Sequence, residues 1–165
     1  MKMLKTLVLT AALLTGATAA HAQVMVKHIQ TDKSPIATGV WAGDTYYLSG
    51  QLASPIKPIA PGDMAKATLA DYGDTKTQAA SVFAKIQKAL QDQGLDMKDV
   101  VKLTVFLAPD PATGKLDFAG MQSQYVKYFG TPDQPNKPAR SAFQVAALAA
   151  PWAMLEVEAI AVRSR

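Results

Sequence analysis

The chain of 165 residues contains no cysteine. Disulfides, thiolate nucleophiles and zinc–thiolate sites are therefore excluded, and stability must come from a hydrophobic core, an oligomer or both. Histidine is almost as scarce, because His28 is the only histidine after residue 22. No G-x-S-x-G segment accompanies it, and a zinc site needs more ligands than one histidine with scattered acids. We interpret His28 as an ordinary residue of the first strand and expect no metal site.

The first 22 residues lack the length of apolar sequence that crosses a bilayer, since their apolar run covers only residues 7–14. Lys2 and Lys5 precede this run, and Ala20-His21-Ala22 fits an A-x-A cleavage site. These features predict a secretory signal peptide over residues 1–22, and an exported, periplasmic or secreted protein without membrane attachment after cleavage. An uncleaved membrane anchor is the alternative.

Excess charge of one sign is also missing. Removal of Lys2 and Lys5 with the signal peptide lowers the formal charge from +4 to +2. A nearly neutral domain has no basic footprint for nucleic acid, so we expect no nucleic-acid partner.

The remaining residues, 23–165, are enough for a single domain. Hydrophobic periodicity predicts two helices, at residues 75–93 and 116–129. The inward apolar stripe of the first is Ala79, Val82, Phe83, Ile86 and Leu90, and that of the second is Phe118, Met121, Tyr125 and Phe129. The first begins with Thr75-Lys76-Thr77-Gln78, which fits a capping box, and stops at Gly94. Alternating or β-branched runs predict strands at residues 24–29, 39–42, 45–49, 100–107, 141–145 and 154–162. Gly43-Asp44 joins the second and third of these as a hairpin, and alternation in the fourth places Val101 on the same face as Leu103. Residues 52–73 contain three prolines and predict either a plain surface loop or a loop that shapes a pocket, with one or two helical turns at residues 64–72.

Two helices and about six strands indicate an α+β fold in which both helices cover one face of a mixed sheet. In the last strand, alternation places Glu156 and Glu158 on the same face as Ile160 and Val162. No further helix is available to cover that face, and a large apolar surface is rarely left to water. The pattern therefore predicts a homo-oligomer.

Three charges occupy unusual places. Arg140 follows a proline-rich loop at residues 131–138 and opens a strand, while Glu156 and Glu158 lie inside an otherwise apolar strand. Charges in such positions tend to be paired or functional. Two interpretations stay open at this point: a structural ion pair between Arg140 and a glutamate, or a functional site.

Five segments resemble, in order and spacing, the signature segments of the reactive intermediate deaminase (Rid) family. They are Ser49-Gly50-Gln51, residues 99–107, residues 125–129, Pro138-Ala139-Arg140-Ser141 and residues 156–162. The resemblance runs in order from about Lys27 to Val162, which is nearly the whole chain after the predicted signal peptide. It implies a chorismate-mutase-like α+β fold and a homotrimer with sites in the clefts between subunits. It also implies hydrolysis of reactive 2-imino and enamine acids, such as 2-aminoacrylate, to 2-oxo acids and ammonia, without cofactor or metal.

The resemblance also implies roles for particular residues. Arg140 would hold the substrate carboxylate and Glu158 would position the attacking water, with Glu156 as a structural or interface carboxylate. The cleft would be lined by Ser49, Gly50, Gln122, where an asparagine is common, and Trp41, which would replace a common tyrosine as an aromatic wall. The chemistry agrees, because a guanidinium grips a carboxylate through two parallel bonds and a carboxylate can orient water and accept its proton.

Two other functions compete with this hypothesis. One is a non-catalytic trimeric protein that either binds small carboxylates or is holdase-like, with Arg140 as an anchor and no turnover. Nuclease activity is the third interpretation, and the low charge and the export signal argue against it.

Overall fold

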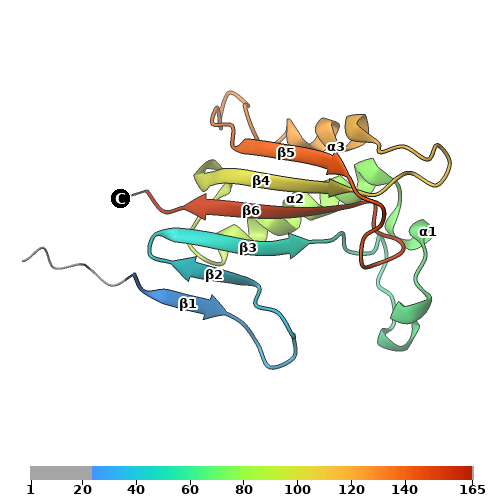
Figure 1. The fold of residues 1–165 in the computed structure, drawn as a ribbon, viewed down its shortest axis with the longest axis horizontal. Helices are drawn as coiled ribbons and strands as arrows, with labels where there is room; N and C mark the ends of the chain where they lie inside the picture. Colours follow the sequence, from blue (N-terminus) through green and yellow to red (C-terminus); the bar gives the residue numbers. More distant parts are fainter. Residues whose placement is uncertain (1–23, 165) are drawn as a thin grey trace, which may run out of the picture.

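A six-stranded sheet with the strand order β1-β2-β3-β6-β4-β5 forms the centre of the fold in a computed structural model that describes residues 24–164 (Figure 1). The predicted signal peptide, residues 1–22, lies outside the described residues. The strands are β1 (Val26–Ile29), β2 (Gly39–Ala42), β3 (Thr45–Gln51), β4 (Val100–Leu107), β5 (Ala139–Gln144) and β6 (Leu155–Val162). Neighbouring strands are antiparallel except β4 and β5, which are parallel. The predicted mixed sheet is therefore confirmed.

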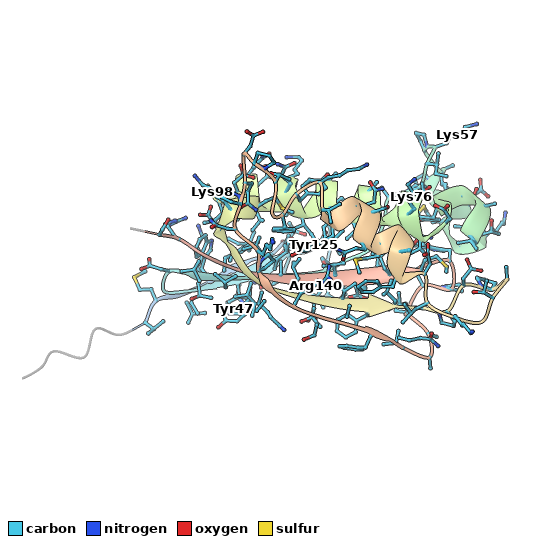
Figure 2. All side chains as sticks on the ribbon, turned by 90° about the horizontal axis from the view of Figure 1, so that it is seen from above. Tyr47, Lys57, Lys76, Lys98, Tyr125 and Arg140 are labelled. Carbon is cyan, nitrogen blue, oxygen red and sulfur yellow. The ribbon has the colours of Figure 1, made fainter. Side chains whose placement is uncertain are left out.

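Two helices, α2 (Thr75–Gln91) and α3 (Phe118–Tyr125), lie on the same side of this sheet (Figure 2). The apolar stripe that the sequence predicted for α2 is fully buried against the sheet and consists of Ala79, Val82, Phe83, Ile86 and Leu90. Burial of each large side chain of this kind contributes about 1.5–3 kcal/mol relative to exposure, so the α2–sheet layer is the main source of stability. The α+β class with helices on one face is confirmed.

The ends of both helices differ from the prediction. The N-cap of α2 is Asp74, whose side chain accepts a hydrogen bond from the Thr77 amide, so the predicted Thr75–Gln78 capping box is wrong. Gln78 is instead completely buried and serves as a clamp. Its Nε2 donates to the carbonyls of Gly73 and Trp152, and its Oε1 accepts from the Met154 amide. The second helix ends at Tyr125 rather than at residue 129, which shortens it to two turns.

The start of β4 contains an irregularity that periodicity alone did not reveal. The register with β6 shifts between Val100 and Lys102, so Val100 is buried and Val101 is 46% exposed. The sequence had placed Val101 on the same face as Leu103, and that assignment is wrong because the bulge adds one residue to the strand. From Lys102 onward the side chains alternate as expected.

The proline-rich segment at residues 52–73 contains a 3-10 helix, η1 (Pro61–Lys66), and a single helical turn, α1 (Leu69–Tyr72). Tyr72 stacks on Trp152 with ring centroids 3.4 Å apart and planes 3° from parallel. The Lys85 ammonium also donates to the carbonyl of Leu52 at 2.7 Å. The long segment is thus fastened at both ends to the helix layer and to the β5–β6 connection. None of the helices within residues 24–164 has the length and apolar character needed to cross a membrane.

Candidate active site

Arg140 is the second residue of β5, as the sequence predicted for the start of that strand. It pairs in register with Leu103, a buried residue of the face that the helices cover, so its side chain projects toward α3. There Nη1 donates a hydrogen bond to Oε1 of Gln122 at 2.8 Å. The guanidinium carbon lies 4.2 Å from the ring centre of Tyr125 and 5.6 Å from that of Phe118. The structure therefore brings together Arg140 and Gln122, which the sequence analysis had both selected.

No carboxylate among residues 24–164 forms an ion pair with Arg140. Glu158 pairs in register with Thr104, whereas Arg140 pairs with Leu103. Because successive side chains of a strand point to opposite faces, Arg140 and Glu158 project from opposite faces of the same sheet. Glu156, two residues from Glu158, shares its face. A structural ion pair between Arg140 and either glutamate of the same chain, one of the two interpretations left open above, is therefore wrong.

Glu158 and Ser49 lie on the face of the sheet that no helix of residues 24–164 covers; we call it the open face. These two residues line a shallow hollow of about 250 Å³ together with Tyr47, Lys102 and Thr104. The Ser49 hydroxyl donates to the carbonyl of Ala37 at 2.7 Å, so only its lone pairs remain for a ligand. Glu158 itself is exposed. The structure thus places Ser49 and Glu158 together but separates both from Arg140 within one chain.

Glu156 lies beside Gly50 on the open face. A methyl group built on Gly50 would collide with the carboxylate of Glu156, so this close approach requires glycine. Gly50 lies where the β3–β6 register shifts between Leu48 and Gln51, which brings the β3 backbone against the glutamate. Burial raises the pKa of the Glu156 carboxyl, and the negative charge of Glu158 raises it further. Sequence reasoning gave Glu156 a supporting role, whereas the structure half-buries its carboxyl beside Gly50, and this burial raises its pKa.

Trp41 lies neither beside Arg140 nor in the hollow with Ser49 and Glu158. It lies on the helix-covered face, 8% exposed, where its indole donates to Oε1 of Gln93 at 3.2 Å and the Arg163 guanidinium lies 4.3 Å from its ring centre. Strands β3, β6 and β4 separate Trp41 from Arg140. The predicted aromatic wall of the cleft is therefore a core residue that fastens the end of β6 to the α2 terminus.

Two aromatic residues at the site, Phe118 and Tyr125, were missed as functional candidates. Sequence analysis assigned both to the inward stripe of the second helix, and Tyr125 is indeed buried, but Phe118 is 44% exposed. Their spacing with Gln122 could have revealed them, because residues 118, 122 and 125 share one face of a helix. Among residues 24–164, no group of three or more His, Cys, Asp or Glu side chains is arranged to hold a metal ion.

Comparisons with known proteins agree with this fold. Residues 33–163 match the sequence model of a family described as Endoribonuclease L-PSP. A RutC family protein from Haemophilus influenzae is 33% identical over 145 residues, which cover 85% of this chain and 99% of the relative. A bovine protein named 2-iminobutanoate/2-iminopropanoate deaminase is 36% identical over 144 residues, which cover 83% of this chain and 90% of the relative.

A solved structure from the same family has a similar fold. The crystal structure of RidA from an Antarctic Psychrobacter species superposes with a TM-score of 0.60 at 33% identity, covering 83% of this chain and 99% of that one. The family match over residues 33–163 covers strands β2 to β6, both helices and the segment around Arg140. The chain belongs to the reactive intermediate deaminase (Rid) family.

Proposed function

We propose that this protein hydrolyses reactive 2-imino acids, and the enamines with which they interconvert, to 2-oxo acids. Water adds to the C=N carbon, the C–N bond breaks, and ammonia leaves as the C=O bond forms. The observation that carries the proposal is the half-buried Arg140 guanidinium, which has an amide and two rings around it but no ion pair with a carboxylate of residues 24–164. A charge in such a place favours an anionic ligand, and a planar guanidinium suits a carboxylate. The named activity of the bovine relative supports imino acids as that ligand.

The site is completed, in this proposal, by a second copy of the chain. Arg140 lies on an edge strand and faces the helices, whereas Ser49, Gly50 and both glutamates lie on the open face. One chain cannot bring these groups onto one substrate. A homotrimer in which the open face of one copy meets the β5 edge of the next would join them and would also cover exposed Tyr47 and Phe143.

The two glutamates have different roles in activating the attacking water. The sequence assigned that role to Glu158, which is exposed and lies in the hollow with Ser49. Burial raises the pKa of Glu156, and a general base works best when its pKa approaches the working pH. We therefore assign proton transfer to Glu156, with Glu158 as the neighbouring charge that raises the Glu156 pKa and orders the water.

A direct assay tests the reaction. An amino-acid oxidase generates 2-iminopropanoate from alanine, and its decay to pyruvate is followed with and without the purified protein. We expect acceleration by the wild-type protein, a loss of at least about 100-fold with Arg140→Ala, and a large loss with Glu156→Gln. Equal decay rates with the wild-type protein and with Arg140→Ala would overturn the proposal for this substrate.

The same preparation separates the competing functions. A non-catalytic carboxylate binder would be stabilised against heat by pyruvate, through Arg140, without accelerating imine decay. A nuclease would bind RNA with an affinity that falls steeply as salt rises.

We also propose that the protein acts outside the cytoplasm, on the basis of the signal-like residues 1–22. N-terminal sequencing of protein recovered from the periplasm or the medium should begin at Gln23. Recovery of uncleaved protein in the membrane fraction would contradict this.

A further inference from the structure

The guanidinium of Arg140 is fixed from three directions by side chains of a single helix. Phe118, Gln122 and Tyr125 of α3 are spaced so that all three lie on one helix face. Gln122 accepts from Nη1 at 2.8 Å, while the guanidinium carbon lies 4.2 Å from the Tyr125 ring centre and 5.6 Å from that of Phe118. The hydrogen bond and the two ring contacts thus restrain the guanidinium from different sides.

The two rings differ in how firmly they are held. Tyr125 is 8% exposed and belongs to an aromatic cluster, with its ring centre 4.9 Å from that of Phe129 and 6.2 Å from that of Phe83. Phe83 is itself fully buried on α2. Phe118 is 44% exposed and lies at the outer end of the site. Tyr125 is therefore a platform built into the core, and Phe118 is a peripheral wall.

We propose that Tyr125 is a positioning residue, which together with Gln122 orients Arg140 so that the Nε–Nη2 edge of the guanidinium receives the substrate carboxylate. This inference rests on the carboxylate-binding role of Arg140 in the proposed function. Gln122 occupies a donor on Nη1, and the opposite edge of the planar group keeps two parallel N–H donors with the spacing of a carboxylate.

An aromatic platform suits this task because stacking leaves every in-plane donor of the guanidinium available. A ring attracts the cation through its face, whereas a carboxylate in the same place would take up the donors that the substrate needs. An arginine that is already oriented loses little conformational freedom when the ligand binds, and this lowers the entropic cost of association.

The test measures pyruvate binding by calorimetry and 2-iminopropanoate hydrolysis in the same variants. Tyr125→Leu removes the ring, and we expect the pyruvate Kd and the imine KM to rise about tenfold while kcat changes less than about threefold. Tyr125→Phe keeps the ring and should restore both values to within about twofold of wild type. Tyr128→Leu is the matched control: this ring also packs on Phe83, with centroids 5.7 Å apart, but does not stack on Arg140.

Two further variants avoid the buried cluster in case Tyr125→Leu fails to fold. Gln122→Leu keeps a similar volume and removes only the acceptor for Nη1, and Phe118→Leu changes an exposed wall. We expect Gln122→Leu to weaken pyruvate binding about fivefold and Phe118→Leu about twofold. The inference is overturned if Tyr125→Leu and Tyr128→Leu bind pyruvate equally well. If Tyr125→Leu does not fold, the inference is overturned when Gln122→Leu binds pyruvate as tightly as the wild type.

Failure of the inference remains distinct from failure of the proposed function. If Arg140→Ala abolishes pyruvate binding while Tyr125→Leu binds normally, Arg140 is the clamp and Tyr125 does not position it. If Arg140→Ala binds pyruvate as tightly as the wild type, the clamp itself is absent and both proposals fall.

Discussion

Gly50 shows how much of the proposed site depends on one missing side chain. Its backbone lies against the Glu156 carboxylate, and a Cβ would occupy the place of the carboxylate oxygen. We predict that Gly50→Ala displaces Glu156 and lowers imine hydrolysis about 10- to 100-fold, because small misplacements of catalytic groups are costly. Gly62→Ala is the matched control, since a Cβ there meets nothing within 4 Å. Full activity of Gly50→Ala would mean that Glu156 is not needed where it lies.

Glu156 should also leave a signature in the pH dependence of stability. Its pKa is raised above the ordinary 4.5, first by burial and then by Glu158, so folding favours the protonated form. The stability from this group is therefore fully present below about pH 4.5 and is lost as pH rises through the higher folded-state pKa. We predict that Glu156→Gln melts at a higher temperature than wild type at neutral pH, and that the difference vanishes at low pH. Melting curves across this range would refute the prediction if the difference stayed constant.

For single residues, the sequence predicted which charged and polar side chains matter better than it predicted what surrounds them. Arg140 and Gln122 were selected in advance, and the structure places them in contact. Tyr125 and Phe118 were assigned to a core stripe, because helical periodicity predicts which residues share a helix face but not which residues that face contacts. Glu156 differs from Glu158 because the β3 backbone packs against it at Gly50. The sequence of β6 alone cannot predict this contact.

Among the elements, the long segment at residues 52–73 depends on the Tyr72–Trp152 stack. We predict that Trp152→Ala removes about 1 kcal/mol of pairing energy and releases this segment locally. Trypsin should then cleave faster at Lys57 and Lys66, while Trp152→Phe, which keeps a ring, should restore protection. Unchanged cleavage at both lysines would show that the Gln78 clamp and the Lys85–Leu52 hydrogen bond hold the segment without the stack.

The boundaries of the helices and strands show which structural features a local sequence pattern can predict. The β2–β3 hairpin was predicted from Gly43-Asp44, and Gly43 has the positive φ of 61° that such a turn requires. The α2 stripe was predicted because 3.6-residue periodicity is strong over seventeen residues. The N-cap was misplaced by one residue because both Asp74 and Thr75 have suitable side chains, and only the geometry separates them. The Val101 bulge depends on pairing with β6, a strand distant in sequence.

For the whole molecule, the open face is the surface through which we expect copies of the chain to assemble. Tyr47 is 48% exposed near its centre, beside Ile160 on the neighbouring strand. We predict that Tyr47→Glu dissociates the oligomer and abolishes imine hydrolysis, because a charge in a covered apolar interface is costly, while the isolated chain keeps its fold. Light scattering gives the mass and circular dichroism the fold. Met64→Glu, a similarly exposed position on η1, is the control and should leave the mass unchanged. A Tyr47→Glu protein with the wild-type mass would contradict the prediction.

The projection of Arg140 and Glu156 from opposite faces of one sheet has a genetic consequence. Each reaction centre of the assembly would draw its cation from one copy and its carboxylate from a neighbour. Arg140→Ala and Glu156→Gln proteins, each inactive alone, should therefore complement one another when they are unfolded together and refolded as mixed oligomers. In an equal mixture about one centre in four would combine an intact arginine with an intact glutamate. Two defective alleles expressed in one cell would then behave as a partly functional gene.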